Sequence, residues 1–265
     1  MNPQSSVYFI DPRQINPDAP LFVYLPGMDG TGKLLQTQSD NLAASFDLRC
    51  LSIRADSHST WQVLARDTVK LIKAELASKT NSEVYLCGES FGGCLALKTA
   101  LAAPDMFQKL ILVNPASSFN QLPHLSWGVN LTSLLPSWVH RYSAVGLLPF
   151  LVRLNRINDC DRDRLIKSMK SVPPHVISWR LSLLRDFKVT DEQLRSLNIS
   201  SLILAGGADD LLPSVKEAHK LANLLPQAQI TVLPQSGHAC LLETDINLYQ
   251  ILKKRNFIPA KYALC

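Results

Sequence analysis

The most informative part of the chain is the run Val84-Tyr85-Leu86-Cys87-Gly88-Glu89-Ser90-Phe91-Gly92-Gly93. An apolar run typical of a strand ends at Cys87, a G-x-S-x-G motif follows, and a helical pattern begins at Phe91. An abrupt strand-to-helix turn exposes its middle residue, and Gly88 and Gly92 remove side chains that would collide across it. Ser90 is therefore predicted at the carboxyl end of a strand and the amino end of a helix, where negative charge is stabilised.

Short apolar runs alternate with longer helical patterns along most of the remaining chain. The predicted strands are Val7–Ile10, Leu21–Leu25, Asp47–Ile53, Glu83–Cys87, Leu110–Asn114, Ser201–Ala205 and Gln229–Leu233. The predicted helices are Lys33–Ala44, Thr60–Ser78, Phe91–Ala103, Ser214–Leu224 and His238–Lys253. Because continuous apolar strands are typical of sheets covered on both faces, we predict an α/β fold with a mostly parallel sheet and helices on both faces. The 265 residues fit one such domain.

The alternation stops in one interval, residues 117–198, where only helical patterns interrupted by prolines occur. We predict that 117–198 is a helical cap, or lid, inserted into a core formed by residues 1–116 and 199–265. The interval holds three of the four tryptophans, Trp127, Trp138 and Trp179. Ten of the 27 Lys and Arg residues lie between residues 139 and 188, against four aspartates.

Two interpretations of this apolar and basic interval remain open. It could cover an acyl chain and touch anionic lipid headgroups through its cations. Alternatively, the cations are ordinary exposed residues and the apolar positions pack on the core.

The overall composition excludes several classes of protein. The net charge is +5 and 18% of the residues are charged, which argues against a disordered chain. No apolar run reaches about 18 residues and no signal peptide pattern occurs at the start, so we expect a cytoplasmic protein, with peripheral membrane contact as the alternative. The six cysteines are scattered, which favours reduced thiols. No motif for nucleic-acid binding or spacing for metal ligands occurs, so we predict no nucleic-acid partner, no metal and no cofactor.

A serine nucleophile needs a base that removes its proton and an acid that orients the base. At this kind of turn the acid and then the histidine are expected later in the chain. His238 follows the last predicted strand and a glycine, whereas the other histidines lie elsewhere: His58, His124, His140, His175 and His219. Asp209, in the loop after the strand Ser201–Ala205, is the predicted acid, and Asp210 is the alternative.

An oxyanion hole requires two backbone donors. The N–H of Phe91, which follows the nucleophile, is the first candidate. The second is the N–H of Met28, in the loop Leu25-Pro26-Gly27-Met28-Asp29-Gly30-Thr31-Gly32 after an early strand. The glycines of this loop match neither G-x-G-x-x-G nor a P-loop, which argues against phosphate binding.

Three stretches together resemble the α/β-hydrolase superfamily and, more narrowly, the hydrolase-like part of plant and cyanobacterial phytyl ester synthases and diacylglycerol acyltransferase-like proteins. They are the loop at 25–32, the segment 87–97 around Ser90, and Asn114-Pro115-Ala116-Ser117-Ser118-Phe119. The resemblance implies an α/β-hydrolase fold and fatty acyl substrates, with phytol or diacylglycerol as acceptors. Two features depart from it. Members usually carry a second, acyltransferase-like region for which 265 residues leave no room, and Pro26 stands where many α/β-hydrolases have histidine.

These features predict a serine-dependent esterase or lipase that acts on fatty acyl esters or thioesters through a Ser90–His238–Asp209 triad and an acyl-enzyme. Its partner would be a small acyl ester or thioester. An acyltransferase that passes the acyl group to phytol, another long-chain alcohol or diacylglycerol is the first alternative. A non-catalytic lipid-binding or scaffold protein is the second.

Overall fold

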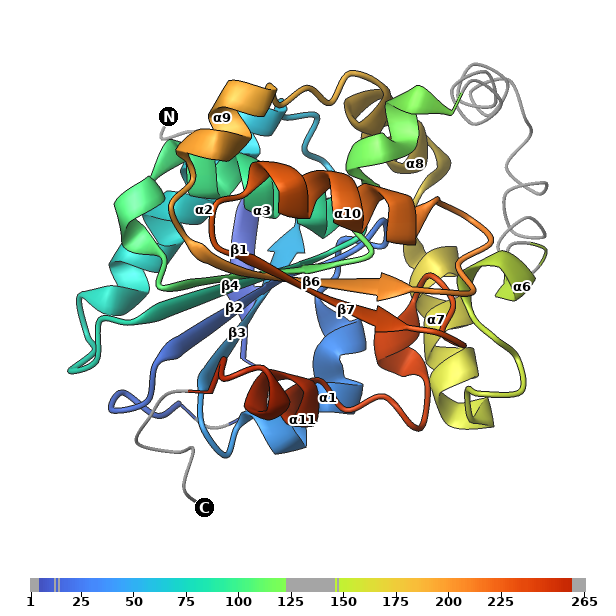
Figure 1. Cartoon of the computed structure of the whole chain (residues 1–265), viewed down its shortest axis with the longest axis horizontal. Helices are drawn as coiled ribbons and strands as arrows, with labels where there is room; N and C mark the ends of the chain where they lie inside the picture. The colour runs from blue at the N-terminus through green and yellow to red at the C-terminus, as the bar shows by residue number, and fades with distance from the viewer. Residues whose placement is uncertain (1–4, 12, 14, 123–145, 147, 259–265) are drawn as a thin grey trace.

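Seven strands form one sheet in the computed structural model, which describes residues 5–11, 13, 15–122, 146 and 148–258 (Figure 1). The strands are β1 (Val7–Ile10), β2 (Leu21–Leu25), β3 (Asp47–Ile53), β4 (Val84–Glu89), β5 (Lys109–Val113), β6 (Ser200–Gly206) and β7 (Ala228–Leu233). Their spatial order is β1-β3-β2-β4-β5-β6-β7. β1 pairs antiparallel with β3, and every other pair is parallel. The predicted mostly parallel sheet is confirmed.

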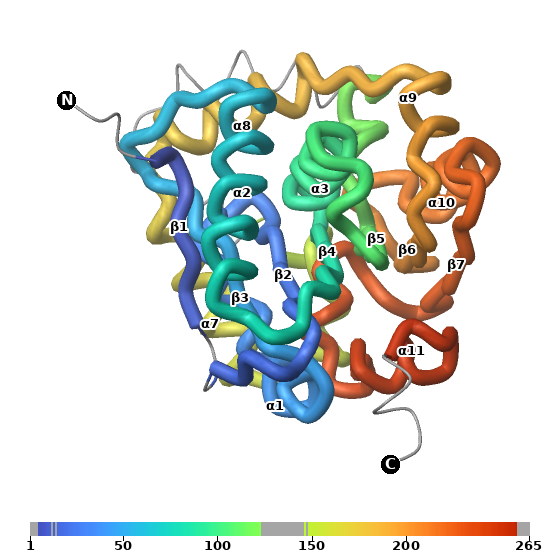
Figure 2. Tube along the Cα trace, turned by 90° about the vertical axis from the view of Figure 1, so that its left-hand side faces the viewer, coloured from blue at the N-terminus to red at the C-terminus, as the bar shows by residue number. Residues whose placement is uncertain are grey.

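Helices cover both faces of this sheet. They are α1 (Gln36–Leu42), α2 (Trp61–Leu76), α3 (Phe91–Ala102), α10 (Ser214–Leu224) and α11 (Leu248–Lys254). Figure 1 shows α2, α3 and α10 on one face and α1 and α11 on the other, and the turned view in Figure 2 shows the same separation. In β2, Val23 joins the core on the α2 and α3 side, whereas Phe22 and Tyr24 join the core on the α1 and α11 side. Both faces of the strand are therefore buried, as its continuous apolar sequence predicts.

Two of the predicted helices are interrupted. The predicted helix Lys33–Ala44 begins as a 3₁₀ turn, η1 (Lys33–Leu35), before α1. The predicted helix His238–Lys253 is wrong over residues 238–247, where a 3₁₀ turn, η4 (Cys240–Leu242), is followed by irregular chain, and it is confirmed only from Leu248, where α11 begins. The side-chain amide of Gln38 donates to the carbonyls of Leu241 and Ile246, at 2.8 and 2.9 Å, and Asn247 caps a new helix by accepting from the Gln250 N–H. These polar contacts take the place of helical hydrogen bonds.

Between β5 and β6 the described residues form helices and no strand. The elements are η3 (Ala116–Gln121), α6 (Leu148–Leu151), α7 (Asp159–Ser171), α8 (Pro174–Arg185) and α9 (Asp191–Ser196), while η2 (Pro104–Met106) precedes β5. Figure 1 shows α7 at the end of the sheet toward which the arrows of β6 and β7 point. Trp127 and Trp138 lie outside the described residues, and Trp179 is on α8. We propose that 117–198 forms a cap on a core of residues 1–116 and 199–265.

Most arginines of the interval 117–198 interact with carboxylates of the same chain. Six of its arginines form ion pairs, namely Arg153–Asp210, Arg156–Glu243, Arg162–Asp159, Arg164–Asp161, Arg185–Asp186 and Arg195–Asp191. Arg180 is buried, and Arg141 lies outside the described residues. The membrane contact that this charge predicted therefore remains a prediction. In the described part of the chain, no helix has the length and apolar character needed to cross a membrane.

Candidate active site

Ser90 lies at the turn between β4 and α3, as the sequence predicts. Its backbone dihedrals are φ 53° and ψ −114°, a sparsely populated conformation that costs roughly 1–3 kcal/mol and persists only where neighbours enforce it. A Cβ at Gly88 would lie 2.2 Å from the Gly92 carbonyl oxygen, and a Cβ at Gly92 would lie 2.0 Å from the Leu25 carbonyl oxygen. The two glycines therefore permit the close packing of strand, helix and loop that holds Ser90 in place.

Ser90, His238 and Asp209 form one hydrogen-bonded series. The Ser90 hydroxyl donates to His238 Nε2 at 2.8 Å, and His238 Nδ1 donates to Asp209 Oδ2 at 2.8 Å. The three come from the loops after β4, β7 and β6, at the carboxyl edge of the sheet. His238 is 3% exposed, so its ring is fixed by packing as well as by both hydrogen bonds. This arrangement can deprotonate a serine hydroxyl and stabilise the resulting imidazolium.

The geometry distinguishes Asp209 from Asp210, the alternative acid. Asp209 Oδ1 accepts from the N–H groups of Leu211 and Leu212 at 2.9 and 3.0 Å, and the Ser214 hydroxyl donates to Oδ2. Burial acts to raise the pKa of Asp209, but the charge of His238 and these hydrogen bonds bring it below the ordinary carboxyl value. Asp210 instead points outward, with its side chain 52% exposed and paired with Arg153.

Asn114 holds the histidine loop in position, a role that the sequence analysis missed. Its side-chain amide donates to the carbonyls of Gly237 and His238 at 3.2 and 2.6 Å, while its Oδ1 accepts from the Gly206 N–H at 2.7 Å. It is fully buried, with φ 41°. A polar residue directly after the apolar strand β5 was the available signal, because a buried amide requires partners.

Glu243 supports the same loop from the other side. Its Oε1 accepts from the Gly237 N–H at 2.8 Å, and its Oε2 accepts from Arg156 Nε at 2.9 Å. Arg156, in the proposed cap, is thereby connected to the loop that carries His238.

The two predicted oxyanion donors, the backbone N–H groups of Phe91 and Met28, have no hydrogen-bond acceptor among the described residues. The Phe91 N–H is the first of α3, and the first N–H groups of a helix have no intrahelical acceptor. Gly27 lies against the nucleophile, since a Cβ there would be 3.8 Å from Ser90 Cβ. Both N–H groups are thus free to donate to an oxygen bound at Ser90.

A second carboxyl group, Glu89, is buried directly before the nucleophile. The Tyr24 hydroxyl donates to its Oε2. Burial raises the pKa of Glu89 to about 7, while the Tyr24 hydrogen bond and the charge of His238 act to lower it. Glu89 therefore changes its protonation state near neutral pH, and its charge interacts with that of His238.

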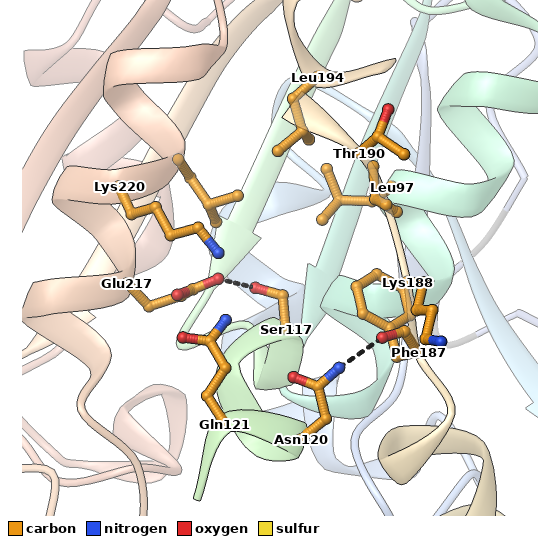
Figure 3. Close-up of a pocket in the computed structure, with 12 residues that line it drawn as sticks. Leu97, Ser117, Asn120, Gln121, Phe187, Lys188, Thr190, Leu194, Glu217 and Lys220 are labelled. Carbon is orange, nitrogen blue, oxygen red and sulfur yellow. Dashed lines mark hydrogen bonds between the residues drawn. The ribbon is translucent and has the colours of Figure 1, made fainter. Parts of the chain in front are cut away.

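A hollow of about 300 Å³ lies apart from these residues, between α3, α10 and the segment after α8 (Figure 3). Ser117 donates to Glu217 within it, and Asn120 donates to the Phe187 carbonyl at 2.7 Å. Its lining includes none of Ser90, Asp209 and His238. Across the described residues, no group of three His, Cys, Asp or Glu is placed to share a metal ion.

Fold and geometry together define the class of protein. A sheet of this order, with a serine at a strand–helix turn that contacts a histidine and an aspartate from later loops, is the arrangement of the α/β-hydrolase superfamily. The chain belongs to the serine hydrolase family described as serine aminopeptidase, S33, whose sequence pattern matches residues 53–245.

Two plant relatives confirm the narrower resemblance. The chain is similar to phytyl ester synthase 1, chloroplastic, of Arabidopsis thaliana, with 31% identity over 89% of this chain and 37% of the relative. Phytyl ester synthase 2, chloroplastic, of the same plant is 27% identical over 89% of this chain and 37% of the relative. The chain thus spans little more than a third of the length of these relatives.

Solved structures confirm the α/β-hydrolase fold. An esterase from Exiguobacterium antarcticum matches with a TM-score of 0.76 at 17% identity, covering 94% of both chains. A thermophilic esterase from Thermogutta terrifontis matches with a TM-score of 0.72 at 19% identity, covering 96% of this chain and 94% of that one.

Proposed function

We propose that the chain is a serine-dependent esterase or lipase that cleaves fatty acyl esters or thioesters through an acyl-enzyme. The observation that carries this proposal is the series from Ser90 through His238 to Asp209, with a 2.8 Å contact at each step. The two free N–H groups of Phe91 and Met28 support it, because they supply the donors that an oxyanion requires.

In the first half-reaction, Ser90 Oγ attacks the acyl carbonyl while His238 Nε2 takes the hydroxyl proton. Asp209 keeps the Nδ1 proton in place and stabilises the imidazolium. The carbonyl oxygen becomes an oxyanion and accepts from the Phe91 and Met28 N–H groups. When the tetrahedral intermediate collapses, the bond to the leaving group breaks and His238 donates its proton to the departing alcohol or thiol. The acyl group remains on Ser90.

In the second half-reaction, an acceptor hydroxyl attacks the acyl-enzyme. His238 takes the acceptor's proton and returns it to Ser90 Oγ as the acyl–serine bond breaks. With water as acceptor the product is a fatty acid, and with an alcohol it is a new ester.

The second candidate function is therefore acyl transfer to phytol, another long-chain alcohol or diacylglycerol. The similarity to the two phytyl ester synthases favours it. The two candidates share every residue named above and differ in the acceptor, which depends on how far water is excluded from the site.

Apolar surroundings support a fatty acyl substrate. Leu148, Val152 and Leu165 of the cap form a buried cluster that contacts Ala239, the residue after His238. An alkyl chain fits such a setting better than a charged acyl group does, because a charge there would lose its hydration.

The test is labelling with a fluorophosphonate probe together with hydrolysis of p-nitrophenyl esters. We expect labelling and turnover in the wild type and neither in Ser90→Ala. Ser118→Ala is the matched control, because Ser118 is also a buried serine and its hydroxyl has no partner among the described residues. Folded wild-type protein that is neither labelled nor active would instead favour a lipid-binding or scaffold protein.

A further inference from the structure

Arg180 is the largest fully buried side chain among the described residues, with 1% of its surface exposed. It lies on α8 in the cap, yet its guanidinium reaches the loop of the proposed oxyanion hole. Nη1 donates to the Met28 carbonyl at 2.6 Å, and Nη2 lies 3.5 Å from the Ile53 carbonyl. The cap helix thus contacts the residue whose N–H is one of the two proposed oxyanion donors.

This buried charge has no ion-pair partner among the described residues. None of their carboxylates lies within ion-pair distance of Arg180, and its Nε has no hydrogen-bond partner. Burial lowers the pKa of Arg180 to about 10, and the charge of Asp29 acts in the opposite direction. A buried, unpaired guanidinium is unfavourable for folding, so an apolar side chain of similar size would serve packing alone at least as well.

The loop is shaped to receive the guanidinium. Gly30 has φ 63°, and a Cβ there would lie 2.3 Å from Arg180 Nη2. The Gly30 N–H donates to the Gly27 carbonyl at 3.0 Å, which closes a turn over residues 27–30. The Met28 carbonyl points out of this turn, and Arg180 is its only donor among the described residues.

Helix α8 is itself attached to the core. Trp179 Nε1 donates to the Ser59 carbonyl at 3.2 Å, and Trp61 Nε1 of the core donates to the Leu183 carbonyl of α8 at 2.8 Å. A second cap helix holds the same loop, because the Ser168 hydroxyl of α7 donates to Asp29 Oδ2 at 2.8 Å. The position of the loop therefore depends on the cap.

We propose that Arg180 is a positioning residue that holds the 27–30 turn through the Met28 carbonyl and so aims the Met28 N–H at the oxyanion. This inference rests on the proposed function. It makes the oxyanion hole a joint product of core and cap, because one donor comes from α3 and the other is fixed from α8. The buried positive charge behind the turn also favours the negative charge that develops at the oxyanion.

The test compares Arg180→Met, Arg180→Lys and Arg185→Met with the wild type. Arg180→Met keeps the length and apolar stem but removes the charge and the donors. Arg185→Met is the matched control, because it removes the charge and donors of an exposed arginine on the same helix that pairs with Asp186 instead of the loop. For each variant, kcat and KM for a p-nitrophenyl ester are measured with the Ki of an alkyl trifluoromethyl ketone, which forms a tetrahedral oxyanion adduct with a nucleophilic serine.

We expect Arg180→Met to lower kcat roughly 30- to 300-fold, near the effect of losing one oxyanion donor, and to change KM less than about threefold. The Ki of the ketone should rise by a similar factor. Arg180→Lys should recover part of the loss, because it keeps a charge and a donor. Arg185→Met should stay within about threefold of the wild type, because it loses only an exposed ion pair. If Arg180→Met does not fold, Arg180→Lys still tests the positioning role. The role then predicts a partial loss of kcat and a rise in Ki by a similar factor.

An unchanged Ki in the Arg180 variants, or an equal loss in Arg185→Met, would overturn the positioning role while leaving the proposed function intact. Wild-type protein without any Ser90-dependent labelling or turnover would overturn both.

Discussion

Replacing Asp209 by asparagine tests the acid with almost no change of shape. Asp209 Oδ1 accepts from two backbone N–H groups, of Leu211 and Leu212, whereas Oδ2 accepts from His238 and Ser214. An asparagine must keep its carbonyl oxygen toward the two N–H groups, because its NH₂ cannot accept from them. Its NH₂ then faces His238 Nδ1, which has to become the acceptor. The histidine proton consequently moves to Nε2, where it blocks removal of the Ser90 proton.

The size of the effect follows from this forced orientation. The opposite orientation, with the amide oxygen toward His238, leaves two buried N–H groups facing another donor, at about 1–3 kcal/mol each. The inactive tautomer is therefore the stable one. We expect kcat to fall about 10⁴-fold, on the order of 5 kcal/mol of transition-state stabilisation, with little change in KM.

The assay is the hydrolysis rate of a p-nitrophenyl ester, with Asp210→Asn as the matched control. Asp210 is the adjacent aspartate, half exposed and paired with Arg153, so its replacement should change kcat by less than about threefold. A loss below tenfold in Asp209→Asn, or an equal loss in Asp210→Asn, would refute the assignment.

Three further results are expected. Glu89→Gln should make stability less dependent on pH. Burial raises the pKa of Glu89 from 4.5 to about 7, so the folded wild type holds a proton that the unfolded chain releases, and up to roughly 3 kcal/mol of its stability is lost as the pH rises from about 4.5 through 7. Urea unfolding of both proteins at pH 5 and 8 measures the difference. Gly92→Ala should lower the free energy of unfolding by about 1–3 kcal/mol, because its Cβ would lie 2.0 Å from the Leu25 carbonyl oxygen. Gly146→Ala is the control in the same unfolding assay, because a Cβ there meets nothing within 4 Å. The esterase should prefer medium or long acyl chains, measured as kcat/KM across p-nitrophenyl esters from acetate to palmitate.

Each of these has a contrary outcome. Equal pH dependence of unfolding in Glu89→Gln and wild type would mean that Glu89 is ionised throughout this range. A stable Gly92→Ala would show that the strand–helix turn can widen without loss. A clear optimum at acetate would count against fatty acyl substrates.

The sheet and the proximity of Ser90, His238 and Asp209 could be predicted from the sequence because both depend on local signals. Continuous apolar runs identified all seven strands, with ends that differ from the observed ones by at most two residues. The glycines around Ser90 indicate the strand–helix turn. The positions of Asp209 and His238 in loops after later strands indicate that they lie near Ser90, because the carboxyl ends of parallel strands meet at one edge of the sheet.

Contacts between residues that are distant in sequence could not be predicted from the sequence pattern. Arg180 lies in an amphipathic helix, where an arginine is ordinarily exposed, and its acceptor is a backbone carbonyl 152 positions away. The break in the predicted helix His238–Lys253 has the same origin, because Gln38 of α1 takes the carbonyls of Leu241 and Ile246. In both cases a side chain pairs with backbone that is distant in sequence, which periodicity does not report.

Product analysis shows whether Ser90 carries the acyl group during turnover. Wild type and Ser90→Ala would each be incubated with a long-chain acyl ester and phytol, and the products identified by mass spectrometry. We predict a fatty acid in the wild type only, or phytyl ester in the wild type only if the second candidate holds. The same products at the same rate from Ser90→Ala, or no product from folded wild-type protein with any long-chain donor, would show that Ser90 does not carry an acyl group.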